Sequence, residues 1–269
     1  MKSLLDCATR CDSPILFDIK FELPQSMNIH LVKTRFSNTY VIEEHGKLLV
    51  ADVAMRCDGF VLDYIVRVLK REVSSVALVV CTHDDPDHIG GVIPLAKACH
   101  AIAAIPHASK RPTLKFYRNP IGPMVKIATA FGEAFRSRSR NMYMNKERNQ
   151  RYEHIHNHHL DEPAAQRFVL PKLRLVDKAK LDGFPNWEVV HTPGHSWDSI
   201  CLFHHPTASL ITGDTLLGSG SKGRLVHPAI YDNPAAMRRS VEKLRRLKPQ
   251  TVYPGHGSIF AGDDILNHL

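Results

Sequence analysis

Residues 82–91 read Thr-His-Asp-Asp-Pro-Asp-His-Ile-Gly-Gly and place two histidines and three aspartates within six consecutive positions. Ionised side chains crowded so closely repel one another and are costly to desolvate unless a counter-charge compensates. A bound divalent cation compensates, because it keeps carboxylates ionised and imidazoles neutral. The stretch follows an apolar run, Val76 to Cys81, typical of a buried strand, and precedes a helix-like segment, Val92 to Cys99. The pattern predicts a metal site at a strand end.

Three further loops deliver a histidine or an aspartate beside glycine or proline at the end of an apolar run. They read His191-Thr-Pro-Gly-His195, Gly213-Asp214-Thr215 and Pro254-Gly255-His256-Gly257. Glycine permits the tight turns and close approach that a ligand loop requires. Four such strand-and-loop units in one chain predict a shared metal cage.

Taken in this order, the four motifs resemble those of the metallo-β-lactamase superfamily, whose first signature is usually H-x-H-x-D-H. The resemblance runs from Asn38 to about His256 and includes Asp52 near the end of a predicted hairpin strand, Tyr40 to Ala54. One position departs from the pattern, since Asp85 stands where the second histidine is usual. An aspartate can still bind a metal, but an added oxygen donor shifts the preference towards harder metals.

The resemblance implies two adjacent metal positions with a water or hydroxide between them. Seven side chains would serve as ligands: His83, Asp85 and His195 at the first position, Asp87, His88 and His256 at the second, and Asp214 as the bridge. Asp87 and Asp214 are the candidate catalytic residues. Zinc is the expected metal at both positions, with manganese or iron as alternatives. Two such ions lower the pKa of the shared water from about 15.7 towards neutrality and polarise the bond to be cleaved.

The carboxylate at position 85 changes the charge balance of this predicted centre. Two dications would be balanced by Asp85, Asp87, Asp214 and a hydroxide, whereas a histidine at position 85 would leave one positive charge. We expect a neutral centre to bind anionic groups less strongly, which favours a carbonyl substrate over a phosphodiester. His191 is expected to be a hydrogen-bonded structural histidine, and Asp52 to support a metal-binding histidine or a turn, rather than to bind metal.

The composition fits one globular enzyme domain of 269 residues, with 43% hydrophobic and 23% charged residues. No apolar run approaches the roughly 20 residues of a membrane span, and the six cysteines lack the paired spacing of a metal knuckle. A cytoplasmic location is therefore expected. The resemblance implies an α/β fold, a four-layer αβ/βα sandwich over residues 1–269, with the metal cleft at the shared sheet edge.

The formal charge of +8 comes from one stretch, residues 108–160, which holds eleven lysines and arginines against three glutamates. The rest of the chain holds 24 basic and 24 acidic residues. Apolar residues recur at helical spacing from Met124 to Phe135, after Pro120 and Pro123. We interpret the stretch as a basic helical insertion that caps the metal cleft and packs its apolar face on the body. Alternatives are a mobile lid, a surface for an anionic partner and a membrane-surface element.

The apolar runs also predict the order of the elements. The N-terminal half is expected to hold strands near residues 28–54, a helix from Phe60 to Arg71 and the strand before His83. The C-terminal half is expected to hold strands near residues 173–177, 187–191, 199–205, 209–213 and 251–253. A further amphipathic helix is expected to begin at Pro234.

The function that the resemblance implies is hydrolysis of an ester, lactone or thioester, as in the glyoxalase II and lactonase branches. A phosphodiesterase or nuclease acting on an anionic substrate is the alternative that the basic insertion favours, although few aromatic residues lie between its basic ones to stack bases. A non-catalytic metal-binding regulatory protein is the third reading. A β-lactamase proper is not favoured, because Asp85 breaks the usual three-histidine set. The expected partner is a small substrate that is anionic or carries an acyl group, rather than nucleic acid; membrane contact and oligomeric state stay open.

Overall fold

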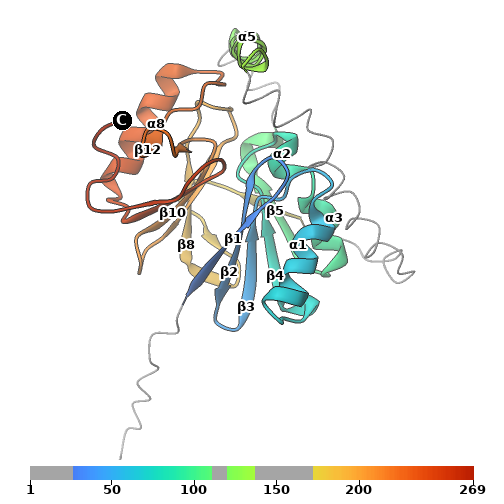
Figure 1. The fold of residues 1–269 in the computed structure, drawn as a ribbon. Helices are drawn as coiled ribbons and strands as arrows, with labels where there is room; N and C mark the ends of the chain where they lie inside the picture. The colour runs from blue at the N-terminus through green and yellow to red at the C-terminus, as the bar shows by residue number, and fades with distance from the viewer. Residues whose placement is uncertain (1–26, 111–119, 137–171) are drawn as a thin grey trace, which may run out of the picture.

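The computed structural model describes residues 27–110, 120–136 and 172–269, and most of its strands form two sheets (Figure 1). The strands of the first sheet are β1 (Asn28–Lys33), β2 (Asn38–Glu44), β3 (Lys47–Ala51), β4 (Val76–Val80), β5 (Ile102–Pro106) and β6 (Lys172–Leu175), in that spatial order. Those of the second sheet, in spatial order, are β14 (Phe260–Ala261), β13 (Thr251–Pro254), β10 (Ser209–Gly213), β9 (Ile200–His204), β8 (Phe184–His191) and β7 (Lys180–Leu181). Strands β11 (Leu217–Ser219) and β12 (Arg224–Val226) form a separate antiparallel pair.

An apolar core lies between the two sheets, because alternate residues of a strand point to the same face. Leu78 and Val80 of β4 belong to this core together with Trp187 of β8, whereas Val79 packs in a second core on the outer face of the first sheet. The buried indole N–H of Trp187 donates to Glu44 Oε2 of β2 at 3.0 Å. A hydrogen-bonded polar pair therefore joins the sheets inside the apolar core.

Helices cover the outer face of each sheet. The structure has α1 (Asp58–Asp63), a π-helical turn (Tyr64–Val68), α2 (Pro86–Ile89), α3 (Val92–Ala98), α5 (Gly122–Ala134) and α8 (Pro234–Arg246), with 3-10 turns at Val73–Ser75 and His107–Lys110. Residues of α1 and α3 pack on the first sheet, and Val241 and Leu244 of α8 pack on the second. The order helix, sheet, sheet, helix confirms the predicted four-layer sandwich.

Two predicted elements differ in the structure. The strand near residues 173–177 was expected in the C-terminal half, but β6 closes the first sheet as the parallel neighbour of β5, a strand that the sequence analysis did not foresee. The helix expected from Phe60 to Arg71 is α1 followed by a wider turn, in which Leu69 N donates to Tyr64 O, five residues earlier, at 3.1 Å. The predicted start of α8 at Pro234 is confirmed, and Asn233 caps it by accepting a hydrogen bond from Ala236 N at 2.9 Å.

The predicted insertion is described only in part, since residues 111–119 and 137–160 lie outside the described residues. Helix α5 has Pro123 in its first turn, as predicted, and lies at the top of Figure 1, on the side of α2. The expectation that its apolar face packs on the body is wrong for the described residues, because Met124, Ile127 and Phe131 are 67–70% exposed. Helical spacing shows that these apolar residues share one face of the helix, but it does not show whether that face is buried. Among the described helices, none is both long and apolar enough to cross a bilayer.

Candidate metal centre

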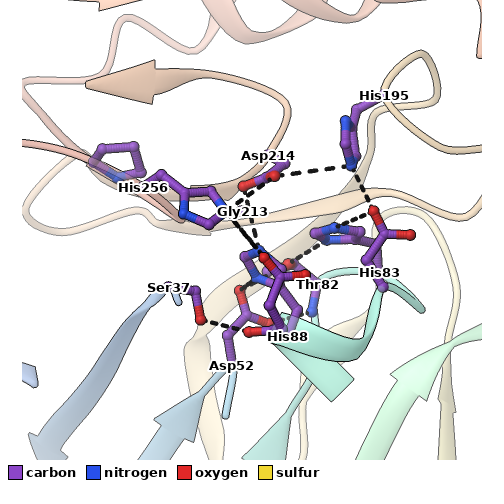
Figure 2. Close-up of polar contacts among 12 residues, drawn as sticks. Ser37, Asp52, Thr82, His83, His88, His195, Gly213, Asp214 and His256 are labelled. Atoms are coloured by element: carbon purple, nitrogen blue, oxygen red, sulfur yellow. Dashed lines mark hydrogen bonds and ion pairs between the residues drawn. The ribbon is translucent and has the colours of Figure 1, made fainter. Parts of the chain in front are cut away.

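Strand ends bring the predicted site residues to one place. Strands β3 and β4 are parallel, as are β10 and β13, so their carboxyl ends meet at the same edge. The residues that follow the carboxyl ends of β3, β4, β8, β10 and β13 include, in turn, Asp52, His83, His195, Asp214 and His256. Segments more than 200 residues apart in sequence thus meet at one site (Figure 2).

The first group consists of His83, Asp85 and His195. Asp85 precedes α2, which begins at Pro86, a residue that suits a first helical turn. The Asp85 side chain makes no capping hydrogen bond to this helix. Its Oδ2 instead lies 3.0 Å from His195 Nε2 and 3.5 Å from His83 Nε2. Three atoms that could hold one cation therefore face one another.

The second group consists of Asp87, His88 and His256. Asp87 Oδ2 lies 3.3 Å from His256 Nε2 and 3.8 Å from His88 Nε2, and the two Nε2 atoms are 3.4 Å apart. In each of the two groups the candidate ligand atoms lie within 4.8 Å of one another. The sequence analysis divided the same six residues into the same two sets.

Asp214 lies between the two groups (Figure 2). Its carboxylate oxygens are 3.3 Å from His88 Nε2, 3.3 Å from His256 Nε2 and 3.8 Å from His195 Nε2. Among the buried side-chain atoms that lack a hydrogen bond in the described structure, two belong to this site, Asp214 Oδ1 and His83 Nε2. Buried polar atoms normally have one, and the mixed imidazole and carboxylate set suits a transition-metal dication. These residues therefore fit the metals that the sequence implies.

Asp52 fixes the orientation of two of these histidines. Its Oδ2 accepts hydrogen bonds from His88 Nδ1 and from the Thr82 hydroxyl, both at 2.8 Å, and its Oδ1 accepts one from Thr82 N at 2.7 Å. Because the Thr82 hydroxyl donates to Asp52, its oxygen is left to accept from His83 Nδ1 at 3.0 Å. His195 is held in the same way, since its Nδ1 donates to Ile230 O at 2.7 Å. All three rings therefore turn Nε2 towards the centre.

His191 is hydrogen-bonded, as expected of a structural histidine. It is absent from the described groups that could hold a metal, and its Nε2 donates to Trp197 O at 2.9 Å. Its backbone N–H donates to Asp177 Oδ1 at 2.7 Å. These contacts keep the strand end from which the His195 loop departs in place.

Glycine 255 allows the loop that carries His256 to approach the centre. A Cβ at this position would lie 2.6 Å from Asp214 Oδ1 and 2.6 Å from His88 Cε1. Real Cβ atoms essentially never come so close to other heavy atoms. Any larger residue here would therefore displace the atoms that face the centre.

The site holds strongly coupled charges. Burial opposes ionisation of His88 and His256, but the nearby carboxylates, Asp214 foremost among them, together outweigh it, raising the pKa of His256 to about 10 and that of His88 well above its usual value. Burial likewise opposes ionisation of Asp214, but the charges of His256 and His88 lower the pKa of its carboxyl. Without metal, protons on these two histidines therefore supply the positive charge that the carboxylates require.

Metal uptake by the apoprotein should consequently release protons. A metal needs the unprotonated Nε2 of His88 and His256, and both rings hold a proton near neutral pH because their pKa values are raised. Protons compete with the metal, so metal affinity should rise as the pH rises towards about 10, the pKa of His256. Calorimetric titrations in two buffers of different ionisation enthalpy would measure the released protons. Binding enthalpies that are equal in both buffers would contradict this prediction.

The sequence analysis missed one charged residue of the site. Lys126 Nζ of α5 lies 2.6 Å from Asp85 Oδ1, although the two residues are 41 positions apart. No local pattern links them, so no signal in a single sequence pointed to the pair. Thr82 was also missed, although a hydroxyl residue directly before His83 was a visible signal. The positive charge of Lys126 adds to the expected charge balance, so the centre with its surroundings is not neutral.

A model of one protein family matches most of the chain. The model is described as the metallo-beta-lactamase superfamily, and it matches residues 32–256. Among solved structures, a metallo-beta-lactamase family protein from Thermus thermophilus has 19% sequence identity and a TM-score of 0.56, over 91% of this chain and 78% of that one. A second structure, described as a di-iron-bound form, has 21% identity and a TM-score of 0.53, over 87% of this chain and 94% of that one. Both structural similarities concern the fold.

Curated relatives match over shorter segments. A beta-lactamase-like protein 2 homolog from Drosophila melanogaster is 36% identical over 74 residues, 28% of this chain and 23% of that protein. An atrochrysone carboxyl ACP thioesterase from Aspergillus fumigatus is 30% identical over 105 residues, 39% of this chain and 29% of that protein. A hydroxyacylglutathione hydrolase from Hahella chejuensis is 40% identical over 96 residues, 35% of each chain. The chain thus spans about a quarter to a third of the length of these relatives.

Proposed function

Because the chain belongs to the metallo-β-lactamase superfamily, a superfamily of metal-dependent hydrolases, we propose that it hydrolyses an ester, lactone or thioester at two adjacent metal positions. The observation that carries this proposal is the pair of ligand groups with Asp214 between them, together with two buried ligand atoms, in Asp214 and His83, that lack a hydrogen bond. The first position would be held by His83, Asp85 and His195, and the second by Asp87, His88 and His256. Asp214 would contribute to both.

The side chains have distinct tasks in this proposal. Asp52 and Ile230 O accept the Nδ1 protons of His88 and His195, so that the Nε2 lone pairs of these two rings can bind a metal. When bound, divalent metals supply a water of lowered pKa and polarise the bond that is cleaved. Asp87 and Asp214 are the candidate catalytic residues, since both carboxylates adjoin His88 and His256 and can orient the attacking water by accepting its protons in hydrogen bonds.

The carbonyl substrate is supported by the names of two relatives. One is called an ACP thioesterase and the other a hydroxyacylglutathione hydrolase, and both names denote cleavage of an acyl thioester. A small acyl-bearing thioester is therefore our first substrate class. Zinc is our first choice of metal, with manganese or iron as alternatives; Asp85 adds an oxygen donor, and one structural neighbour is described as di-iron-bound.

Lys126 supports a second candidate, a phosphodiesterase. Its ammonium group lies at the edge of the site and contacts Asp85, which would favour an anionic substrate. The earlier preference for a carbonyl substrate, which rested on a neutral centre, therefore loses its electrostatic basis. The thioester stays the first substrate class because of the names of the two relatives.

A matched substrate panel tests the proposal. Apoprotein would be loaded separately with zinc, manganese and ferrous iron, and assayed with a p-nitrophenyl ester, a lactone, an S-acyl glutathione and bis-p-nitrophenyl phosphate. We expect kcat/KM for the thioester or ester to exceed that for the phosphodiester at least about tenfold, with the activity lost in Asp87→Asn. A preference for the phosphodiester would establish the second candidate. Bound metal without any hydrolysis would favour a non-catalytic metal-binding regulatory protein.

A further inference from the structure

The two oxygens of the Asp85 carboxylate have different partners, and Lys126 is one of them. Asp85 Oδ1 accepts a hydrogen bond from Lys126 Nζ at 2.6 Å, while Oδ2 faces His195 Nε2 at 3.0 Å and His83 Nε2 at 3.5 Å. The Lys126 side chain is 19% exposed and that of Asp85 26% exposed. A pair so far withdrawn from solvent is screened less than a surface ion pair. Only one oxygen of Asp85 is therefore left for the first metal position.

A second contact ties α5 to the same metal position. Thr129, one turn after Lys126, accepts a hydrogen bond from Tyr231 N at 3.3 Å, while its hydroxyl donates to Val125 O of the same helix at 2.9 Å. The preceding residue, Ile230, provides the carbonyl that holds His195 Nδ1 at 2.7 Å. One contact of the helix thus ends on Asp85, and the other ends on the residue next to the one whose carbonyl holds His195.

The apolar stripe of α5 lies on another side of the helix. Met124, Ile127 and Phe131 are exposed, whereas Lys126 and Thr129 make the polar contacts with Asp85 and Tyr231. These three exposed side chains therefore do not hold the helix on the described body, whereas the polar side reaches the site.

The positive charge of Lys126 compensates the negative charge that Asp85 adds to the centre. With Asp85 in place of a neutral histidine, the two-metal centre with its hydroxide would lose one unit of positive charge. The ammonium group of Lys126 restores that unit next to the substituted carboxylate. The Asp85–Lys126 pair carries no net charge, as a neutral histidine would, and still offers one ligand atom.

We propose that Lys126 is a positioning residue for the first metal, and that Asp85 and Lys126 together take the place of the histidine that is usual in the first signature. The inference rests on the two-metal assignment of the proposed function. Restoring the usual histidine at position 85 should therefore weaken metal binding rather than improve it. Asp85→His, which restores the usual signature, leaves the Lys126 charge beside the metals without its carboxylate partner, and like charges repel.

A double-mutant cycle on metal affinity tests this pairing without any assay of activity. The four proteins are the parent, Asp85→His, Lys126→Met and the double variant. Zinc affinity and the number of zinc ions bound would be measured for each apoprotein by competition with a chromophoric chelator at one pH. The cycle compares the effect of Asp85→His with and without Lys126. The intrinsic difference between aspartate and histidine as ligands is present in both comparisons and cancels.

We expect Asp85→His to weaken zinc binding by a factor at least about ten times larger when Lys126 is present than when Lys126 is replaced. A coupling of this size lies within the range usual for residues in contact. Lys126→Arg should stay within about threefold of the parent, because it keeps the charge. Exposed Lys47, at the other end of β3 and roughly 15 Å of strand away from the site, supplies the matched control. Lys47→Met should show no coupling to Asp85→His.

Two results would overturn the inference. In the first, the parent binds two zinc ions, but Asp85→His changes zinc affinity by the same factor, to within about twofold, with and without Lys126. The two-metal centre would then stand, and the Lys126 contact would be incidental. A parent that binds neither zinc nor manganese nor iron would remove both the inference and the proposed function. Circular dichroism and thermal unfolding of each apoprotein would identify a variant that fails to fold, in which case Lys126→Gln replaces Lys126→Met.

Discussion

Asp214→Asn should abolish hydrolysis and release metal, since it changes the one carboxylate that adjoins both ligand groups. Replacing a residue that merely hydrogen-bonds a metal ligand usually costs about 10- to 100-fold in affinity or activity. The loss of the negative charge between both groups should exceed that, so we expect kcat/KM to fall by more than about 100-fold. Metal content and kinetics on the same preparation would measure both effects.

A matched control separates this effect from a general loss of charge. Asp182 is an exposed aspartate next to β7, and Asp182→Asn should leave metal content and kcat/KM unchanged. If Asp214→Asn instead kept full metal content and at least half of the parent activity, Asp214 would not serve the two positions, and the assignment of the bridge would be wrong.

Asp52→Ala should produce the largest loss of stability among the site variants. Asp52 is 1% exposed and accepts three hydrogen bonds, two from Thr82 and one from His88. Removing one partner of a buried charged pair typically costs about 3–5 kcal/mol. Alanine would also have to adopt the left-handed φ of +59° seen at this position, which disfavours it further. We expect a fall in Tm of roughly 6–20 °C for a chain of this size.

A second substitution separates the backbone from the hydrogen bonds. Asn tolerates left-handed φ values, so Asp52→Asn should keep the turn and the bond from Thr82 N while it loses an acceptor for His88. Its stability should lie between those of the parent and Asp52→Ala, with metal affinity about 10- to 100-fold weaker than in the parent. Thermal unfolding of the apoproteins and chelator competition measure these values. A change of less than about 1 kcal/mol in Asp52→Ala would show that Asp52 does not organise the site.

The strand ends and ligand loops could be predicted from the sequence because their features are local. Each ligand loop follows an apolar run and contains glycine or proline, so strand, turn and candidate ligand could be recognised together. The predicted strands at β4, β8, β10 and β13 are present in the structure. The resemblance then supplied their spatial order, which the runs alone do not encode.

Non-local pairing explains the errors. Leu173 and Leu175 of β6 indicate a strand, but nothing in their pattern says that the neighbour is β5 in the first sheet. A strand pairs through backbone hydrogen bonds, and an apolar run fits either sheet equally well. The same limit applies to Lys126, because its contact with Asp85 depends on where α5 lies relative to a motif 41 residues away.

Metal content per chain, measured by elemental analysis on protein expressed without a histidine tag, tests the central claim most directly. The account predicts close to two metal ions per chain, because the two ligand groups and Asp214 form adjacent positions. One ion per chain would contradict the two-metal centre and require a mononuclear mechanism. No retained metal, and no uptake of zinc, manganese or iron by the apoprotein, would contradict the hydrolase itself.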